Sequence, residues 1–230
     1  MSIKNKKQSE WQKSRKNTIG FFVGKQKKGL SLKDSPWVTL AAGVQLQNLV
    51  IEGVIKEGMK VLDVGCSIGI ETLYLSKQGL DATGIDFVPE TISISKQLVS
   101  LTGSKAKFIC GDFLETDFTK DMGSYDLIID QGCFHHFPVS ERSKYAQRVN
   151  YLLKEGGLFF LRGFSDQMLP SPTNDGPIRL SSDDIINTFD KFLHTERLYR
   201  FKNLPLPEPH AYKPQIFWAF LGKKRPGNSK

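Results

Sequence analysis

A glycine-containing turn directly after a short apolar run is the most informative feature of this sequence. The run Val61-Leu-Asp-Val ends at Gly65, and Gly69 follows after three further residues. Glycine lets the backbone pass close to a bound nucleotide, so a strand, such a turn and a helix in series favour nucleotide binding. The Gly-x-x-x-Gly spacing differs from that of dinucleotide sites, and it lacks the Gly-Lys-Ser or Gly-Lys-Thr of a P-loop. The turn therefore indicates a nucleotide held by neither of these two motifs.

Asp86 supplies a polar partner for the sugar of such a nucleotide. It ends a second apolar run, Asp81-Ala-Thr-Gly-Ile-Asp86, and lies 21 residues after Gly65. An acid in this place points into the same crevice and can accept hydrogen bonds from both hydroxyls of a ribose. Taken alone, either feature also fits a tight strand–helix connection beside a surface aspartate.

Two adjacent histidines offer acid–base chemistry in the segment Asp130-Gln-Gly-Cys-Phe-His-His. Imidazole titrates near neutral pH, so His135 or His136 can act as a general base toward a hydroxyl, whereas an ionised thiolate needs no base. For each histidine the alternative is a structural role, hydrogen-bonded inside the protein. Cys133 lies close to both, but no fourth ligand accompanies the three, so we expect no metal site.

Elements of alternating type must position these groups. Short apolar runs of β type alternate with helical stretches, which indicates a parallel sheet covered by helices on both faces. The expected strands are residues 60–65, 81–86, 105–110, 125–130 and 157–162, and the expected helices are residues 38–55, 70–77, 89–101 and 140–153.

The end of the chain breaks this alternation. A loop rich in Pro, Ser and Gly over residues 165–177 leads to a short helix near 182–189, which begins with Ser and Asp as helix N-termini prefer. Residues 193–204 and 214–223 are expected to be two strands with Pro-rich residues between them. They predict a closing hairpin.

The positive charge is concentrated at the N-terminus. Residues 1–30 contain nine Lys or Arg and one Glu, which accounts for the net charge of +8 and leaves the rest of the chain neutral. A basic arm can contact nucleic acid or an anionic membrane, or it can be a solvated terminus. Trp11, Phe21 and Phe22 interrupt the arm, so we expect part of it to pack on the body.

Composition bears on the compartment. Hydrophobic residues make up 39% of 230 residues, enough to form a core, and no stretch approaches the roughly 18 apolar residues of a membrane span. The N-terminus lacks the apolar core of a secretory signal. Three cysteines without a CxxC pair argue against a disulfide framework and a structural zinc site. We expect a cytoplasmic protein.

Residues 60–162 resemble a class I S-adenosylmethionine-dependent methyltransferase in the order and spacing of five motifs. Ser67 departs from the family pattern, which usually has Gly at this place in the turn. The five motifs are Asp63-Val-Gly-Cys-Ser-Ile-Gly69, Gly84-Ile-Asp86, Gly111-Asp112-Phe113, the strand Tyr125-Asp-Leu-Ile-Ile-Asp130 and the turn Leu153-Lys-Glu-Gly-Gly157.

The resemblance implies an α/β fold with a Rossmann-like, doubly wound, mostly parallel seven-stranded sheet. Helices cover both faces, and the C-terminal hairpin is antiparallel. Residues 37–224 are then the methyltransferase domain, residues 1–36 a basic arm that is also a candidate lid, and residues 225–230 a flexible tail.

The resemblance also implies that the cofactor is S-adenosylmethionine. Acids accept hydrogen bonds from its hydroxyl and amino groups, glycines admit its methionine part, and aromatic rings form a wall beside the adenine, unless those rings are ordinary core residues. The implied residues are Asp63, Gly65, Cys66 and Gly69 for the methionine part, Asp86 for the ribose, Asp112 with Phe87 and Phe113 for the adenine, and the backbone of Asp130, Gln131 and Gly132 for the amino group.

The methyl acceptor is expected to be a small molecule. The segment after Asp130 does not read Asn-Pro-Pro-Tyr or Asp-Pro-Pro-Tyr, which argues against amino groups of adenine or glutamine. It resembles the bacterial thiopurine- and tellurite-resistance-type methyltransferases. His135 or His136 would serve as the base, and the polar residues of the expected rim, Arg162, Asp166 and Arg179, would select a charged substrate or be ordinary surface charges.

Two rival functions remain open at this point. A nucleic-acid methyltransferase would use the basic arm to grip phosphates, and its binding would weaken steeply with salt. A non-catalytic module would keep the fold and perhaps the cofactor for a binding role. The near-complete set of cofactor motifs counts against a relic that has lost its chemistry.

Overall fold

The computed structural model describes residues 41–115, 122–168, 178–203 and 215–227. The basic arm, with Trp11, Phe21 and Phe22, lies outside the described residues, as does most of the loop over residues 165–177.

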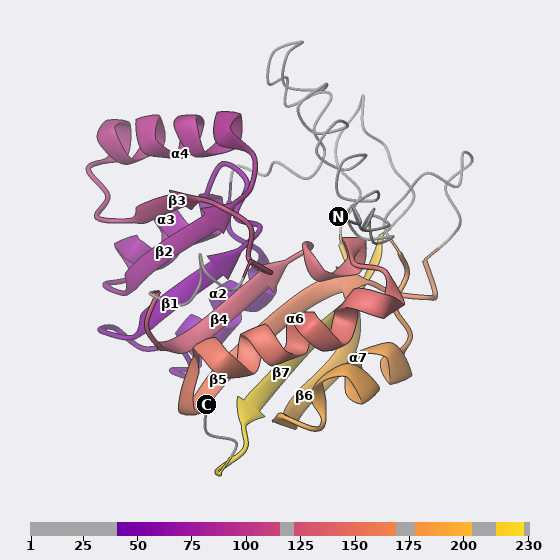
Figure 1. Cartoon of the computed structure of the whole chain (residues 1–230). Helices are drawn as coiled ribbons and strands as arrows, with labels where there is room; N and C mark the ends of the chain where they lie inside the picture. The colour runs from indigo at the N-terminus through magenta and orange to yellow at the C-terminus, as the bar shows by residue number, and fades with distance from the viewer. Residues whose placement is uncertain (1–40, 116–121, 169–177, 204–214, 228–230) are drawn as a thin grey trace, which may run out of the picture.

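One seven-stranded sheet organises the chain, in the order β3-β2-β1-β4-β5-β7-β6 (Figure 1). Strands β3, β2, β1, β4 and β5 are parallel, whereas β7 pairs antiparallel with both β5 and β6. The mostly parallel sheet and the closing hairpin are thus confirmed. The strands are β1 (Lys60–Val64), β2 (Asp81–Asp86), β3 (Lys107–Cys110), β4 (Tyr125–Gln131), β5 (Leu153–Phe164), β6 (Leu193–Lys202) and β7 (Ile216–Lys224).

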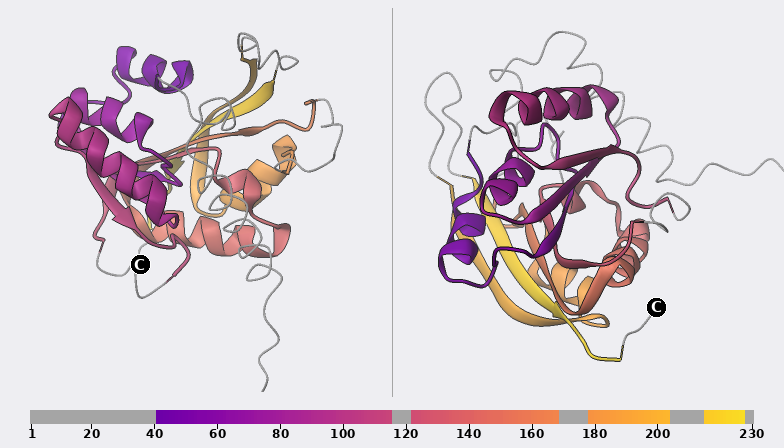
Figure 2. Two further views of the ribbon diagram at one scale, coloured as in Figure 1. Left: turned by 90° about the horizontal axis from the view of Figure 1, so that it is seen from above. Right: turned by 90° about the vertical axis from the view of Figure 1, so that its left-hand side faces the viewer.

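Helices cover both faces of the sheet. Figure 2 shows α2, α3 and α4 on one side and α6 and α7 on the other. Their bounds are α2 (Val44–Ile51), α3 (Ile70–Lys77), α4 (Pro89–Thr102), α6 (Val139–Leu152) and α7 (Ser182–Phe189), and a short 3₁₀ turn, η1 (Phe134–His136), follows β4. No helix among the described residues is long and apolar enough to cross a membrane.

Local chemistry explains where several helices begin and end. Pro89 starts α4, because its missing N–H is not needed in the first turn, and Gly103 ends that helix in a left-handed conformation. The Ser181 hydroxyl accepts from the backbone N–H of Asp184, whose carboxylate accepts from the N–H of Ser181. This capping box fixes the start of α7 as the sequence predicts.

Several boundaries differ from those expected. Within the described part of the helix expected over residues 38–55, only α2 is helical, because turns follow Ile51. The strand expected over 157–162 begins earlier, at Leu153, which pairs with Tyr125 before a register shift. The expected helix over 140–153 accordingly ends one residue sooner, since Leu153 is extended.

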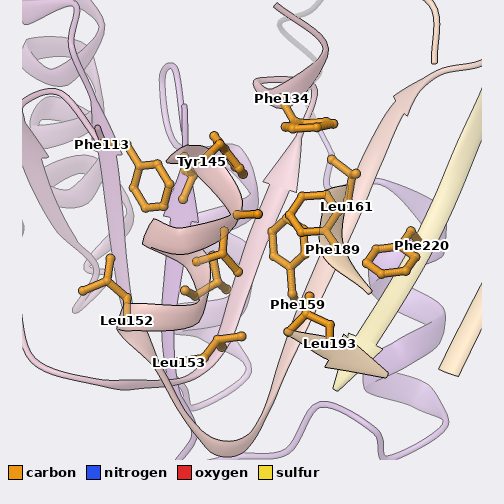
Figure 3. Close-up of a cluster of buried hydrophobic side chains, with 14 of the residues drawn as sticks. Phe113, Phe134, Tyr145, Leu152, Leu153, Phe159, Leu161, Phe189, Leu193 and Phe220 are labelled. Carbon is orange, nitrogen blue, oxygen red and sulfur yellow. The ribbon is translucent and has the colours of Figure 1, made fainter. Parts of the chain in front are cut away.

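The larger core lies between the sheet and helices α6 and α7. Tyr145 is fully buried at its centre, with its ring centroid 5.1 Å from those of Phe113 and Phe134. Close ring contacts of this kind add to the stabilisation from apolar burial. Figure 3 shows the cluster, with labels on Phe113, Phe134, Tyr145, Leu152, Leu153, Phe159, Leu161, Phe189, Leu193 and Phe220.

Ser67, the departure from the family turn, has a left-handed backbone with a φ of 51°. A left-handed backbone costs an L-residue roughly 1–2 kcal/mol of stability. Replacing it by glycine removes this cost, but glycine has greater conformational freedom in the unfolded state, which offsets part of the stabilisation. Ser67 forms hydrogen bonds through its backbone, with the N–H donating to the Asp86 carboxylate and the carbonyl accepting from the Ser95 hydroxyl. Ser67→Gly keeps them.

We therefore expect Ser67→Gly to raise the free energy of unfolding by about 0.5–1 kcal/mol in urea denaturation. The matched control is Ser100→Gly in the exposed helix α4, which should lower it by a similar amount. A destabilised Ser67→Gly would show that the serine side chain itself supports the turn.

Candidate functional site

The functional residues expected from the sequence meet at the carboxyl ends of β1, β2 and β4. These three strands are neighbours in the sheet, and β1 lies between the other two. Ligands of open α/β sheets bind beyond the carboxyl ends of the strands. The structure thus brings the glycine turn, Asp86 and the Asp130 segment to one edge.

The glycines of the turn are required for packing within the chain. Gly65 and Gly69 have φ values of 69° and 83°. A Cβ on Gly69 would lie 2.3 Å from the Phe108 ring of β3, and one on Gly65 would lie 2.6 Å from the Cβ of Cys133. The turn therefore lies directly on β3 and on the segment after β4, which leaves no room for a side chain at either position.

Asp86 organises the turn from the end of β2. Its carboxylate accepts from the backbone N–H of Ser67 at 3.0 Å and from that of Val88 at 2.9 Å. Burial raises the pKa of Asp86, and these hydrogen bonds oppose that rise. The residue is half-buried, and a carboxylate has lone pairs beyond the two in use. It remains able to accept from a ligand.

Asp63 faces helix α3 and is buried. It accepts from the Thr72 hydroxyl at 2.6 Å, which ties the end of β1 to the first turn of α3. Burial raises the pKa of Asp63 most, and the negative charge of Glu71 adds to the rise. Cys66, in the turn itself, is buried too, and its thiol pKa is raised well above 9.0 by burial. This thiol stays protonated and is not a nucleophile.

The expected adenine residues divide into two groups. Asp112 is buried, and it lies beside Asp86 because the N–H of the preceding Gly111 donates to the Asp86 carbonyl. The Asp112 carboxylate accepts from the N–H of Leu114. Phe87 is half-buried next to Asp86. Phe113 instead packs in the large core against Tyr145, so its contacts within the chain are those of a core aromatic residue.

Asp130 holds the segment after β4 in place. Its carboxylate accepts from the backbone N–H of Gly132, Cys133 and Phe134 at 3.0, 2.8 and 2.8 Å and from the Tyr145 hydroxyl. Burial raises the pKa of Asp130 to about 6 in spite of these four donors. The side chain thus serves the loop, which leaves the backbone of residues 130–132 as the part that can contact a cofactor.

His135 joins two strand ends. Its Nδ1 accepts from the Phe164 N–H at 3.1 Å, its ring also donates to the Gly132 carbonyl, and it stacks on the Phe164 ring at 4.8 Å. Burial lowers its pKa well below 6.5. With both nitrogens engaged, His135 positions the loop after β4 against the end of β5.

His136 is less deeply buried than its neighbour. Burial lowers its pKa to about 4, so it is neutral at physiological pH and able to accept a proton only weakly. The ring centroids of His135 and His136 are 4.8 Å apart. Among the described residues, no group of three or more His, Cys, Asp and Glu is arranged to hold a metal ion.

The sequence analysis missed Glu71 as a member of this site. It lies in the first turn of α3, where an acid is ordinary because it favours the helix dipole. The structure places its carboxyl by the Gly43 N–H, and burial raises its pKa while the Arg162 guanidinium lowers it. No local pattern joins residues 43, 71 and 162, so only the fold could reveal the group.

The site as a whole is acidic. Asp63, Glu71, Asp86 and Asp130 all have raised pKa values, mainly because of burial, and the charges of the other three also raise that of Asp63. A cation bound among them would relieve this repulsion. S-adenosylmethionine carries a sulfonium and an ammonium group, so the donor set fits this cofactor.

Comparisons with known proteins agree with the fold and show the family. A family model described as a methyltransferase domain matches residues 61–157. An uncharacterized methyltransferase of Schizosaccharomyces pombe is 33% identical over 119 residues, which are 52% of this chain and 79% of that protein. The 2-heptyl-1-hydroxyquinolin-4(1H)-one methyltransferase of Mycobacteroides abscessus is 28% identical over 158 residues, 68% of this chain and 67% of that protein.

A solved structure shares the fold. It is the 1,6-didemethyltoxoflavin-N1-methyltransferase of Burkholderia thailandensis with bound 1,6-didemethyltoxoflavin and S-adenosylhomocysteine. The TM-score is 0.71 at 18% identity, over 96% of this chain and 92% of that one. With the sheet order, the glycine turn and the similarity to methyltransferases along most of their length, the chain belongs to the class I S-adenosylmethionine-dependent methyltransferases.

Proposed function

We propose that this enzyme transfers the methyl group of S-adenosylmethionine to a nucleophilic sulfur, oxygen or nitrogen atom of a small molecule. The observation that carries the proposal is the group of four carboxyl side chains beside the glycine turn, where ligands of this fold bind. They belong to Asp63, Glu71, Asp86 and Asp130. The names of the mycobacterial relative and of the Burkholderia structure, both methyltransferases of small heterocycles, support the class of acceptor.

Different residues hold different parts of the cofactor. When bound, the cofactor supplies an electrophilic methyl group on its sulfonium sulfur. Asp86 accepts from the ribose hydroxyls, and Asp112 with Phe87 borders the adenine. The backbone at Gly65 and Gly69 borders the methionine part. The described site residues that complete this set are Asp63, Cys66, Phe113, Asp130, Gln131 and Gly132.

Positioning does most of the catalysis in such a reaction. Holding two reactants in line removes on the order of 7 kcal/mol from a barrier. His135 and the Asp130 carboxylate fix the loop that faces the acceptor. His136 is the better candidate for a base, because both nitrogens of His135 are engaged. Its low pKa favours acceptors that are already ionised or that need little help to ionise.

The cellular setting follows from the same chemistry. Cys66, Cys110 and Cys133 are all free thiols, which supports a cytoplasmic location. Residues 1–36 remain a basic arm and residues 37–224 the methyltransferase domain in this proposal. The nucleic-acid alternative depends on the arm alone, which lies outside the described residues.

The experiment that tests the proposal is calorimetric titration of the purified protein with S-adenosylmethionine, S-adenosylhomocysteine and NAD in parallel. We expect micromolar binding of the first two and none of NAD. Failure of both sulfur compounds to bind to a folded protein would remove the function and leave a binding module. Screening thiols, phenols, amines and RNA for methyl acceptance then separates small molecules from nucleic acid.

Cofactor binding is expected to depend on pH. A bound cation lowers the raised pKa values of these carboxyl groups, among which Asp130 has a pKa of about 6. Binding therefore releases protons and strengthens as the pH rises. We expect the affinity for S-adenosylmethionine to increase roughly tenfold between pH 5 and 7, as about 1.4 kcal/mol of charge interaction implies. The affinity for S-adenosylhomocysteine, which lacks the sulfonium charge, should increase less over the same pH range.

The measurement is titration calorimetry across this range, repeated at pH 6 in two buffers of different ionisation enthalpy. The buffers report directly how many protons leave. Equal pH profiles for the two compounds would mean that the carboxylates do not face the sulfonium.

A further inference from the structure

Two hydrogen-bond donors without partners lie side by side beyond the acidic crevice. Gln131 ends β4 and is the register partner of Arg162 on β5. The Gln131 Nε2 and the Arg162 Nε are both buried, and neither has a hydrogen-bond partner among the described residues. A buried donor left unpaired costs about 1–3 kcal/mol, so native proteins keep few of them unless a ligand or water completes them.

The two side chains share one small space. A Cβ on Gly43 would lie 3.3 Å from the Gln131 Oε1 and 3.4 Å from the Arg162 Nη1, so both side chains end close to the backbone of Gly43. Burial lowers the pKa of Arg162, and the negative charges of Glu71 and Asp130 oppose that change in part. The guanidinium therefore keeps its charge next to acids that balance it.

A row of aromatic rings borders the guanidinium. The Arg162 guanidinium carbon is 5.1 Å from the centroid of the Phe217 ring. Phe164 and Phe201 are the register partners of Phe217 on either side, and their rings stack on it at 4.7 and 5.6 Å. Phe164 also stacks on His135, which joins this row to the loop after β4.

The row and the donors lie on the same face of the sheet. Side chains alternate along a strand, so Arg162 and Phe164 point to one face of β5 together. That face also carries Phe160, which packs with Leu46 of α2. This part of the sheet thus combines aromatic rings with two donors, at the edge where ligands of this fold bind.

We infer that this space is the acceptor subsite, and that it takes planar aromatic molecules carrying an oxygen that accepts hydrogen bonds from Arg162 and Gln131. The inference rests on the proposed function, since the acceptor must reach the methyl group next to the loop after β4. A ring oxygen held by a guanidinium is stabilised in its ionised form. This agrees with a site whose candidate base, His136, is weak.

The test is titration calorimetry with saturating S-adenosylhomocysteine present, using four probes. 2-Naphthoate and 2-naphthol are planar and offer an oxygen, one ionised and one neutral. 2-(Aminomethyl)naphthalene is planar but offers only donors, and cyclohexanecarboxylate offers the oxygen without a flat ring. We expect one or both oxygen-bearing naphthalenes to bind at least tenfold more tightly than the other two probes. Tighter binding of the naphthoate assigns an ionised oxygen, and tighter binding of the naphthol a neutral one.

Arg162→Met should reduce the affinity for the preferred naphthalene at least tenfold while the affinity for S-adenosylhomocysteine stays within twofold. Arg162→Lys keeps the charge but loses Nε, and it should still reduce probe binding several-fold. Arg162→Lys tests the inference if Arg162→Met does not fold. The matched control is Arg200→Met: Arg200 also lies over an aromatic ring, Trp218 at 4.0 Å, but on the other face of β7. It should leave probe binding unchanged.

Each outcome bears on the inference. Equal binding of all four probes, or unchanged probe binding in Arg162→Met, overturns it while the methyltransferase function stands. Loss of S-adenosylhomocysteine binding in Arg162→Met, with the fold intact by circular dichroism, assigns the donors to the cofactor and also overturns it. Wild-type protein that fails to bind S-adenosylhomocysteine at all contradicts the proposed function instead.

Discussion

Replacing Asp130 by alanine is expected to lower the free energy of unfolding by about 2–4 kcal/mol at pH 7. The change leaves the N–H groups of Gly132, Cys133 and Phe134 and the hydroxyl of Tyr145 without their acceptor. Each buried donor left unpaired costs about 1–3 kcal/mol, and the removal of a costly buried charge offsets part of the sum. Urea denaturation followed by tryptophan fluorescence measures the loss.

The matched control is Asp126→Ala on the same strand. Asp126 is half-buried, pairs with Lys154 at 2.7 Å and accepts from the partly exposed Lys60 N–H at 2.8 Å, which water can satisfy instead, so its loss should cost about 1 kcal/mol. Similar losses in the two variants would show that the loop after β4 does not depend on the Asp130 carboxylate.

The pH dependence gives this prediction a second readout. The pKa of Asp130 is about 6 in the folded protein, above its ordinary value of 3.8, so the folded state binds this proton more tightly than the unfolded state does. The wild type therefore loses this contribution to stability as the pH rises from about 4 to about 6. Asp130→Ala lacks the group, and the difference between the two proteins should narrow across that window.

Asp86→Ala is expected to weaken the binding of S-adenosylmethionine at least tenfold, about 1.4 kcal/mol. The variant loses the acceptor for the ribose hydroxyls, and it also releases the N–H groups of Ser67 and Val88 that hold the turn. Both effects act against binding. Calorimetric titration measures the dissociation constant.

Asp81→Ala is the matched control at the other end of β2. Asp81 is exposed and pairs with Lys107 far from the crevice, so its replacement should leave the dissociation constant unchanged. An unchanged constant in Asp86→Ala would remove Asp86 from the ribose role.

Local patterns predicted those elements whose boundaries are marked by local chemistry. Helix α3 and strand β2 have the expected bounds, because glycine, proline or a charged turn residue marks each end. Strand β5 begins four residues before the expected start, since its extension depends on pairing with Tyr125, which is 28 residues away from Leu153 in the sequence. Nothing local in Leu153-Lys-Glu-Gly indicates a strand.

The same distinction between local and distant signals applies to the residues of the candidate site. The glycine turn and Asp86 could be predicted, because a strand and its following turn are continuous in sequence. The sequence could not show which of His135 and His136 is free to act as a base, since this depends on the Phe164 N–H from β5. Glu71, Gly43 and the unpaired donor of Gln131 come together only in the folded chain.

The anchoring of the loop after β4 bears on how this protein can change over generations. Asp130 fixes the backbone of the loop from beneath, through N–H groups that every residue except proline possesses. The side chains at 131 and 136 can therefore vary in type without moving that backbone. A lineage built on this anchor can drift from one acceptor to another by single substitutions, while the cofactor half of the crevice stays as it is.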